Sequence, residues 1–106
     1  MQPTSTLRHL VLCRFIDGTA AEQCARIVED FASLPLKIAG IRHFESGLNN
    51  SPEGLNQGYT HCFRLDFDDE AARDAYLIAP AHLAFVERLK PWLAAVLVFD
   101  YWGSAP

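Results

Sequence analysis

The chain has 106 residues, of which 50% are hydrophobic and 21% are charged. This length holds one ordinary domain, and the apolar fraction is sufficient to bury a core. The formal net charge is -4 and no two Lys or Arg residues are adjacent, so the clustered positive charge that a nucleic-acid surface needs is missing. We therefore expect a single domain over residues 1–106 and no nucleic-acid partner.

The N-terminus and the cysteines bear on where the protein works. The opening segment lacks the basic and apolar regions of a signal peptide, and no later apolar run approaches the ~20 residues that span a bilayer. Cys13, Cys24 and Cys62 occur singly inside apolar patterns rather than in C-x-x-C pairs, which favours reduced core thiols. We therefore expect a cytoplasmic protein with no membrane partner.

Residues 7–16 predict a first strand that is apolar on both faces. Leu10 and Leu12 point to one side, whereas Val11 and Cys13 point to the other. A strand of this kind has to be covered on both sides.

A helix is predicted to follow from about residue 20 to residue 34. Thr19 and Glu22 have the spacing of a capping box, and Pro35 is expected to end the helix. Its apolar residues recur at the spacing of a helical stripe. They are Cys24, Ile27, Val28 and Phe31.

Two further strands are predicted at residues 38–48 and 58–67, joined by a loop. The turn formers of residues 49–54 break the first of these strands, on which His43 is interpreted as part of a solvated edge. The second strand alternates, and one face carries most of its aromatic side chains. That face holds Tyr59, His61, Phe63, Leu65 and Phe67.

The last third of the chain predicts a broken helix and a final strand. Asp68 or Asp69 can cap a short helix, after which Pro80 opens a second helical segment that Pro91 closes. Residues 94–102 form a continuous run of apolar strand formers, long enough for an interior strand.

The order β-α-β-β-α-β predicts an α+β, ferredoxin-like fold with its core at about residues 7–102. In this fold a four-stranded antiparallel sheet carries both helices on one face. The other face is left bare, although the first and last strands are apolar on both sides. We therefore expect a homodimer in which a second copy covers the helix-free sheet face.

Four segments together resemble the stress-responsive dimeric α/β-barrel domain family, often called Dabb. They read HLVLCRF, GYTHCFRLDF, AYLIAPAHLAFVERLKP and VFDYW, and the resemblance covers nearly the whole chain. It implies a dimer whose two sheets pack face to face into a barrel. Some members are stress-induced proteins with no settled chemistry, and another cyclises a linear polyketide.

The resemblance to that polyketide cyclase implies a set of site residues. A helix histidine, here His82, would act as general base beside a tyrosine, here Tyr76. Histidines of the first and third strands, here His9 and His61, would line the pocket. The cyclase has a further histidine where this chain has Ala79, which departs from the pattern.

His82 also has a case from its own position. It falls on the predicted helical stripe that includes Phe85 and Leu89, so its ring points inward. An imidazole is well matched to proton abstraction near neutral pH, and Tyr76 can donate to a developing enolate. The alternative is a buried histidine that hydrogen-bonds across the core, beside a tyrosine that only packs. A void of roughly 300 Å³ or more beside His82 would favour ligand chemistry.

The remaining candidates predict a ligand pocket between sheet and helices. We expect His9, His61, Tyr59 and Phe85 to contact a small apolar or aromatic ligand. Together with His82, the two strand histidines would give three nitrogen ligands, but no H-x-H or H-E-x-x-H spacing supports a zinc site. No metal and no cofactor are expected.

Two functions from different classes therefore stay open. The first is an apolar-ligand pocket with His82 and Tyr76 acid–base chemistry, similar to polyketide cyclisation. The second is a non-catalytic stress-response or structural dimer with histidines buried for packing. A cofactor-free or haem-dependent monooxygenase rests on fold analogy alone.

Overall fold

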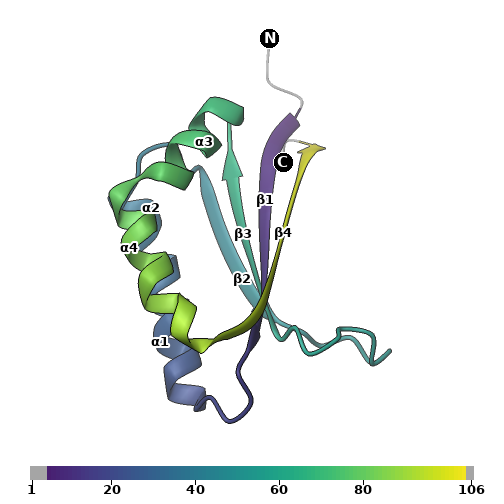
Figure 1. Cartoon of the computed structure of the whole chain (residues 1–106). Coiled ribbons are helices and arrows are strands. Elements are labelled where there is room, and N and C mark those ends of the chain that lie inside the picture. Colours follow the sequence, from purple (N-terminus) through teal and green to yellow (C-terminus); the bar gives the residue numbers. More distant parts are fainter. Residues whose placement is uncertain (1–4, 105–106) are drawn as a thin grey trace.

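A computed structural model describes residues 5–104, which form one antiparallel sheet with helices on one side (Figure 1). The strand order is β2-β3-β1-β4. The strands are β1 (Ser5–Phe15), β2 (His43–Leu48), β3 (His61–Phe67) and β4 (Leu93–Ser104). The predicted α+β, ferredoxin-like architecture is confirmed. Within the described residues, no helix is long and apolar enough to cross a membrane.

The helices follow the predicted pattern in outline. They are α1 (Ala21–Ala32), α2 (Leu34–Lys37), α3 (Glu70–Ile78), α4 (Pro80–Leu89) and the 3-10 turn η1 (Lys90–Trp92). The second helical region is broken at Pro80, as expected, because proline suits a first helical turn. Asp69 caps α3, since its Oδ1 accepts from the backbone N–H of Ala72 at 2.9 Å.

Two details of the first helix were predicted wrongly. The cap residue of α1 is Ala20, which makes no side-chain cap bond. Thr19 Oγ1 instead donates to the carbonyl of Ile16 at 2.6 Å and closes the turn before the helix. Pro35 does not end α1 but lies in the first turn of α2, where its missing N–H has no partner to lose.

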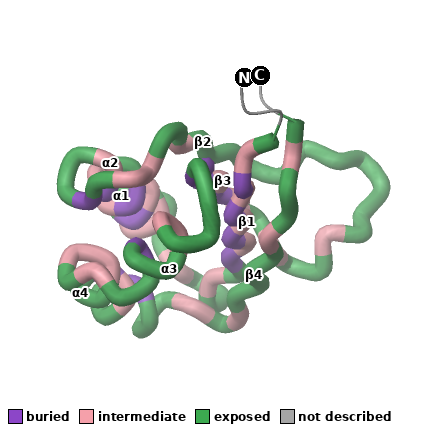
Figure 2. The backbone as a smooth tube through the Cα atoms, turned by 90° about the horizontal axis from the view of Figure 1, so that it is seen from above, coloured by how far each residue is buried: buried purple, intermediate pink, exposed green. Residues whose placement is uncertain are grey.

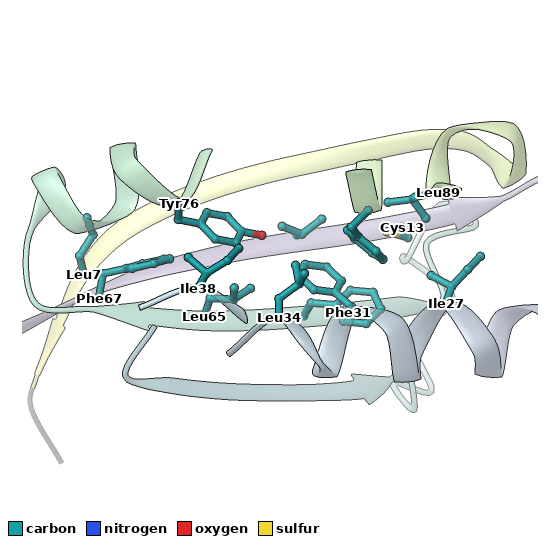
Figure 3. Packing of buried hydrophobic residues seen from close by; sticks show 13 residues of the cluster. Leu7, Cys13, Ile27, Phe31, Leu34, Ile38, Leu65, Phe67, Tyr76 and Leu89 are labelled. Atoms are coloured by element: carbon teal, nitrogen blue, oxygen red, sulfur yellow. The ribbon is translucent and has the colours of Figure 1, made fainter. Parts of the chain in front are cut away.

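The core fills the layer between the sheet and the helices (Figure 3). At its centre, the Phe31 ring packs against Phe63 and Phe85, with centroid distances of 4.4 and 4.7 Å. Tyr76 and Phe67 lie toward one end of the layer, and the α1 residue Ile27 lies toward the other. The predicted stripe residues Ile27, Phe31, Phe85 and Leu89 are all buried.

The last strand was predicted as interior, but β4 is an edge strand with little cover on either side (Figure 2). Residues paired across β1 and β4 share a side of the sheet. Phe99 pairs with Leu10 on the helix-free side and is 60% exposed. Val98 pairs with Val11 on the helix side and is 53% exposed. A single chain does not bury the apolar run, because the helices lie over the other strands.

Charged groups also sit on the helix-free side of the sheet. Arg8 Nη1 donates to Asp66 at 2.8 Å, and Arg64 Nη2 donates to the same carboxylate at 2.9 Å. Asp66 is only 3% exposed. This face therefore combines apolar residues on β1 and β4 with a closed ion pair network on β1 and β3.

Candidate functional site

His82 and Tyr76 lie in contact where the second helical region is broken. Ala79 closes α3 and precedes α4, which brings the first turn of α4 back beside Tyr76. The two ring centroids are 4.4 Å apart. His82 Nδ1–H donates to the carbonyl of Leu77 at 3.0 Å, because a carbonyl oxygen only accepts. In the neutral ring Nε2 is then left as the basic nitrogen.

His9 and Asp100 extend this contact into the sheet. The His9 ring is 3% exposed and meets Tyr76 edge-on at 5.7 Å. His9 Nδ1–H donates to Asp100 at 2.7 Å, and Arg73 Nη1 donates to the other oxygen of that carboxylate at 3.0 Å. A chain of contacts therefore runs from Asp100 through His9 and Tyr76 to His82. These four residues are called here the Tyr76–His82 cluster.

Sequence reasoning missed Asp100 and Arg73 as members of this site. The available signal was a single acidic residue interrupting the apolar run of the last strand. A carboxylate in such a strand needs a partner, and its register opposite His9 supplies one.

Burial sets the protonation states of the two central groups. It lowers the pKa of His82, an effect that the nearby His9 strengthens and the hydrogen bond to the Leu77 carbonyl opposes. Burial raises the pKa of Tyr76. At neutral pH the pair therefore consists of a neutral imidazole and a protonated phenol, which is the combination required of a base and a proton donor.

We expect an NMR titration to place the pKa of His82 below its ordinary value of 6.5. The neutral ring then contributes stability that is fully present above about pH 6.5 and is lost as pH falls through the folded-state pKa. The signal is assigned by its loss in His82→Ala. A titration midpoint at or above 6.5 would contradict the burial of this ring.

An exposed apolar strip lies beside the cluster on the helix side of β4. Val96 pairs with Cys13 and Val98 with Val11, so both valines face the same side as Asp100. They are 47% and 53% exposed. The strip therefore borders the cluster at Asp100, two residues from Val98 on the same face of β4.

The other predicted site residues do not join this cluster. His61 pairs with Cys13, whereas His9 pairs with Leu65, so the two histidines share a face but lie four residues apart along β1. That spacing is about 13 Å at ~3.3 Å per residue. Phe85 is only 2% exposed, because it is buried in the aromatic core against Phe31.

The pockets of the described residues include two that are not lined by His9, Tyr76 or His82. One, of about 520 Å³, lies between the helix-free sheet face and the β2–β3 connection and is lined by Tyr59, Leu12 and Leu97. The other, of about 970 Å³, lies beside α1 and reaches His61. Neither of these two pockets is the void beside His82 that would favour ligand chemistry there.

The described part of the chain bears on metal ligands and on the Cys13 thiol. Residues 5–104 contain no group of three or more His, Cys, Asp or Glu side chains arranged to hold a metal ion. Burial, with a further contribution from Cys62, raises the pKa of Cys13 to about 12. This thiol is therefore protonated and unreactive at neutral pH.

Comparison with known proteins gives the family. Residues 7–103 match the model of the stress responsive A/B barrel domain. The stress-response A/B barrel domain-containing protein HS1 of Arabidopsis thaliana is 35% identical over 95 residues, covering 90% of this chain and 87% of that protein. Olivetolic acid cyclase of Cannabis sativa is 24% identical over 95 residues, covering 90% and 94% respectively.

A solved structure of another protein has the same fold. A protein from Jannaschia sp. CCS1, described as dimeric and ferredoxin-like, superposes with a TM-score of 0.78 at 26% identity, covering 91% of this chain and 97% of that one. The family model runs from β1 to β4, and the alignment with the Arabidopsis relative covers 90% of the chain. This chain belongs to the stress responsive A/B barrel domain family.

Proposed function

We propose that this protein binds a small apolar or aromatic molecule beside the Tyr76–His82 cluster and performs acid–base chemistry on it. The observation that carries the proposal is the contact between His82, with Nε2 free, and the protonated Tyr76. The similarity to olivetolic acid cyclase supports chemistry on a polyketide-like compound.

Each group has a role that follows from its contacts. His82 Nε2 removes a proton from a carbon next to a carbonyl, and the Tyr76 hydroxyl donates to the enolate oxygen that forms. His9 acts as a positioning residue, because Asp100 holds its ring and the ring packs against Tyr76. The exposed Val96 and Val98 provide apolar surface for the rest of the ligand.

We further propose that two copies pair through the helix-free sheet face. Leu97 and Phe99 of β4 are about half exposed there, at 48% and 60%. A relative of the same fold is described as dimeric. Pairing of two sheets through this face removes these apolar residues from water.

Deuterium exchange into phenylacetone tests the acid–base proposal, because its benzylic protons are acidified by both a ring and a carbonyl. We expect the parent protein to accelerate the exchange and His82→Ala to lower the protein-catalysed rate by about 100-fold, the usual minimum for a general base. Tyr76→Phe should lower it by about 100-fold, the lower end for loss of one donor to a developing oxyanion. Leu83→Ala is the matched control, since Leu83 lies on α4 and is exposed.

The stability of His82→Ala separates this function from the alternative. Removal of a half-buried functional histidine should lower the free energy of unfolding by less than about 1 kcal/mol. The alternative predicts that His82→Ala leaves the exchange rate unchanged and lowers the free energy of unfolding by about 1 to 3 kcal/mol. That result would support a structural histidine in a non-catalytic dimer.

A further inference from the structure

The pocket beside α1, called here the α1 pocket, lies outside the proposed catalytic cluster. It is formed by one side of α1 from Ala21 to Glu29, the turn after β1, and the neighbouring ends of β2 and β3. Its volume of about 970 Å³ is within the range of small-molecule sites. Its walls include Phe15, Ile16, Val28 and Leu48, so much of the lining is apolar.

The aromatic core separates the α1 pocket from the Tyr76–His82 cluster. Phe31 packs against Phe63 and Phe85 in the layer between them. The pocket and the cluster share no residue. A molecule bound in one place would therefore not touch the reactive groups of the other.

His61 provides a polar group on the wall of the α1 pocket. Its ring meets the edge of Phe15 at 5.0 Å, and its Nδ1 lies 2.7 Å from Thr60 Oγ1. Burial lowers the pKa of His61, so the ring is neutral at physiological pH. With Nδ1 occupied by Thr60, Nε2 is the ring nitrogen available to a ligand.

The charges around the α1 pocket indicate what it excludes. Its lining includes two carboxylates, Asp17 and Glu29, and no Lys or Arg, but the Arg14 side chain lies against the lining residue Gly58. The lining residues themselves therefore offer no Lys or Arg partner to an anionic ligand. Both carboxylates are exposed to solvent, so they offer little attraction to a cation. A hydroxyl group suits His61 because it can either donate to or accept from the neutral imidazole.

We propose that the α1 pocket is a second ligand site, which takes a neutral apolar molecule carrying a hydroxyl group that hydrogen-bonds to His61. This site does not depend on the acid–base function proposed above. The ligand class is that of phenols and apolar alcohols rather than carboxylic acids.

Calorimetric titration with four naphthalene probes tests the ligand class. They are 1-naphthol, naphthalene, the anion 1-naphthoate and the cation 1-naphthylmethylammonium. We expect 1-naphthol to bind at least tenfold more tightly than each of the others. His61→Phe should keep the ring but remove the advantage of naphthol over naphthalene. Tighter binding of the anion or the cation would overturn the assignment.

Two tryptophan variants of α1 test the location. Ala25 lines the pocket, whereas Ala32 lies on the same helix outside it, and both are exposed. Ala25→Trp should weaken 1-naphthol binding at least tenfold, and Ala32→Trp should leave it unchanged. Equal binding by both variants would overturn the location. A change in sedimentation instead of binding would show that the α1 pocket seats a second copy, which also overturns the proposal.

One further variant separates the two proposals of this structure. His82→Ala should leave 1-naphthol binding unchanged, because His82 does not line the α1 pocket. Loss of naphthol binding in this variant would show that there is only one site, at the Tyr76–His82 cluster. Failure of phenylacetone exchange, in contrast, would remove the acid–base proposal and leave the α1 pocket intact.

Discussion

Phe99→Asp is expected to convert the proposed dimer into a monomer. Phe99 is 60% exposed in the single chain and lies on the helix-free face opposite Leu10. In a two-fold interface each substitution occurs twice, so two uncompensated carboxylates would be buried at several kcal/mol each. We expect the dimer dissociation constant to rise by at least about 1,000-fold, equivalent to ~4 kcal/mol. Sedimentation at micromolar concentration measures this change.

Ile78→Asp is the control for this substitution. Ile78 is also apolar and is 74% exposed, but it lies on α3 on the helix side of the sheet. It should leave the dimer intact, and circular dichroism should show that both variants are folded. A parent protein that sediments as an 11.8 kDa monomer, or a Phe99→Asp variant that stays dimeric, would refute pairing through this face.

Asp66→Ala should cause the second large effect, a loss of about 3 kcal/mol in the free energy of unfolding. The carboxylate is 3% exposed and accepts hydrogen bonds from both Arg8 and Arg64. Its removal leaves two guanidinium groups without their partner on a face that we propose is covered, and such losses cost ~3–5 kcal/mol. We take the lower value because Arg64 keeps some contact with solvent. Urea unfolding at one fixed protein concentration provides the measurement.

Asp68→Ala is the matched control, because Asp68 pairs with Arg42 at 2.8 Å but both side chains are more than half exposed. Exposed pairs of this kind contribute at most about 1 kcal/mol. Equal losses of unfolding free energy in the two variants would show that the Asp66 network stabilises the fold no more than an exposed ion pair does.

The pH dependence of the Asp66 network follows from the same contacts. Burial alone would raise the pKa of Asp66, but hydrogen bonds from Arg64 and Arg8 outweigh it and hold the pKa below its ordinary value of 3.8. The network therefore contributes stability above about pH 4, which is lost as pH falls through the folded-state value.

Hydropathy patterns predicted most of the fold because each pattern reports which side of an element meets the core. The alternation in β1 correctly placed Val11 and Cys13 on one face and Leu10 on the other, and the structure shows that the helices cover the face with Val11 and Cys13. The stripe containing Ile27 and Phe31 correctly marked the buried side of α1. The apolar run of β4 was misassigned as interior, since periodicity shows that a strand is to be covered but not by which chain.

The candidate site was only partly predictable. The sequence and its family resemblance selected His82 and Tyr76, and the structure brings their rings into contact. Nothing in the local pattern showed that Asp100 would meet His9, because that contact depends on the register of β4 against β1. The register of β3 against β1 places His61 away from His9, beside a different pocket.

The sequence by itself thus determined the order of elements, their buried faces and the family, because these depend on local periodicity and on motifs of adjacent residues. Only the tertiary structure decided which polar groups meet. Asp100 and His9 are 91 positions apart, and Arg8 and Asp66 are 58 apart. Such contacts arise from strand pairing across the whole sheet, where a shift of one residue would turn each side chain to the opposite face.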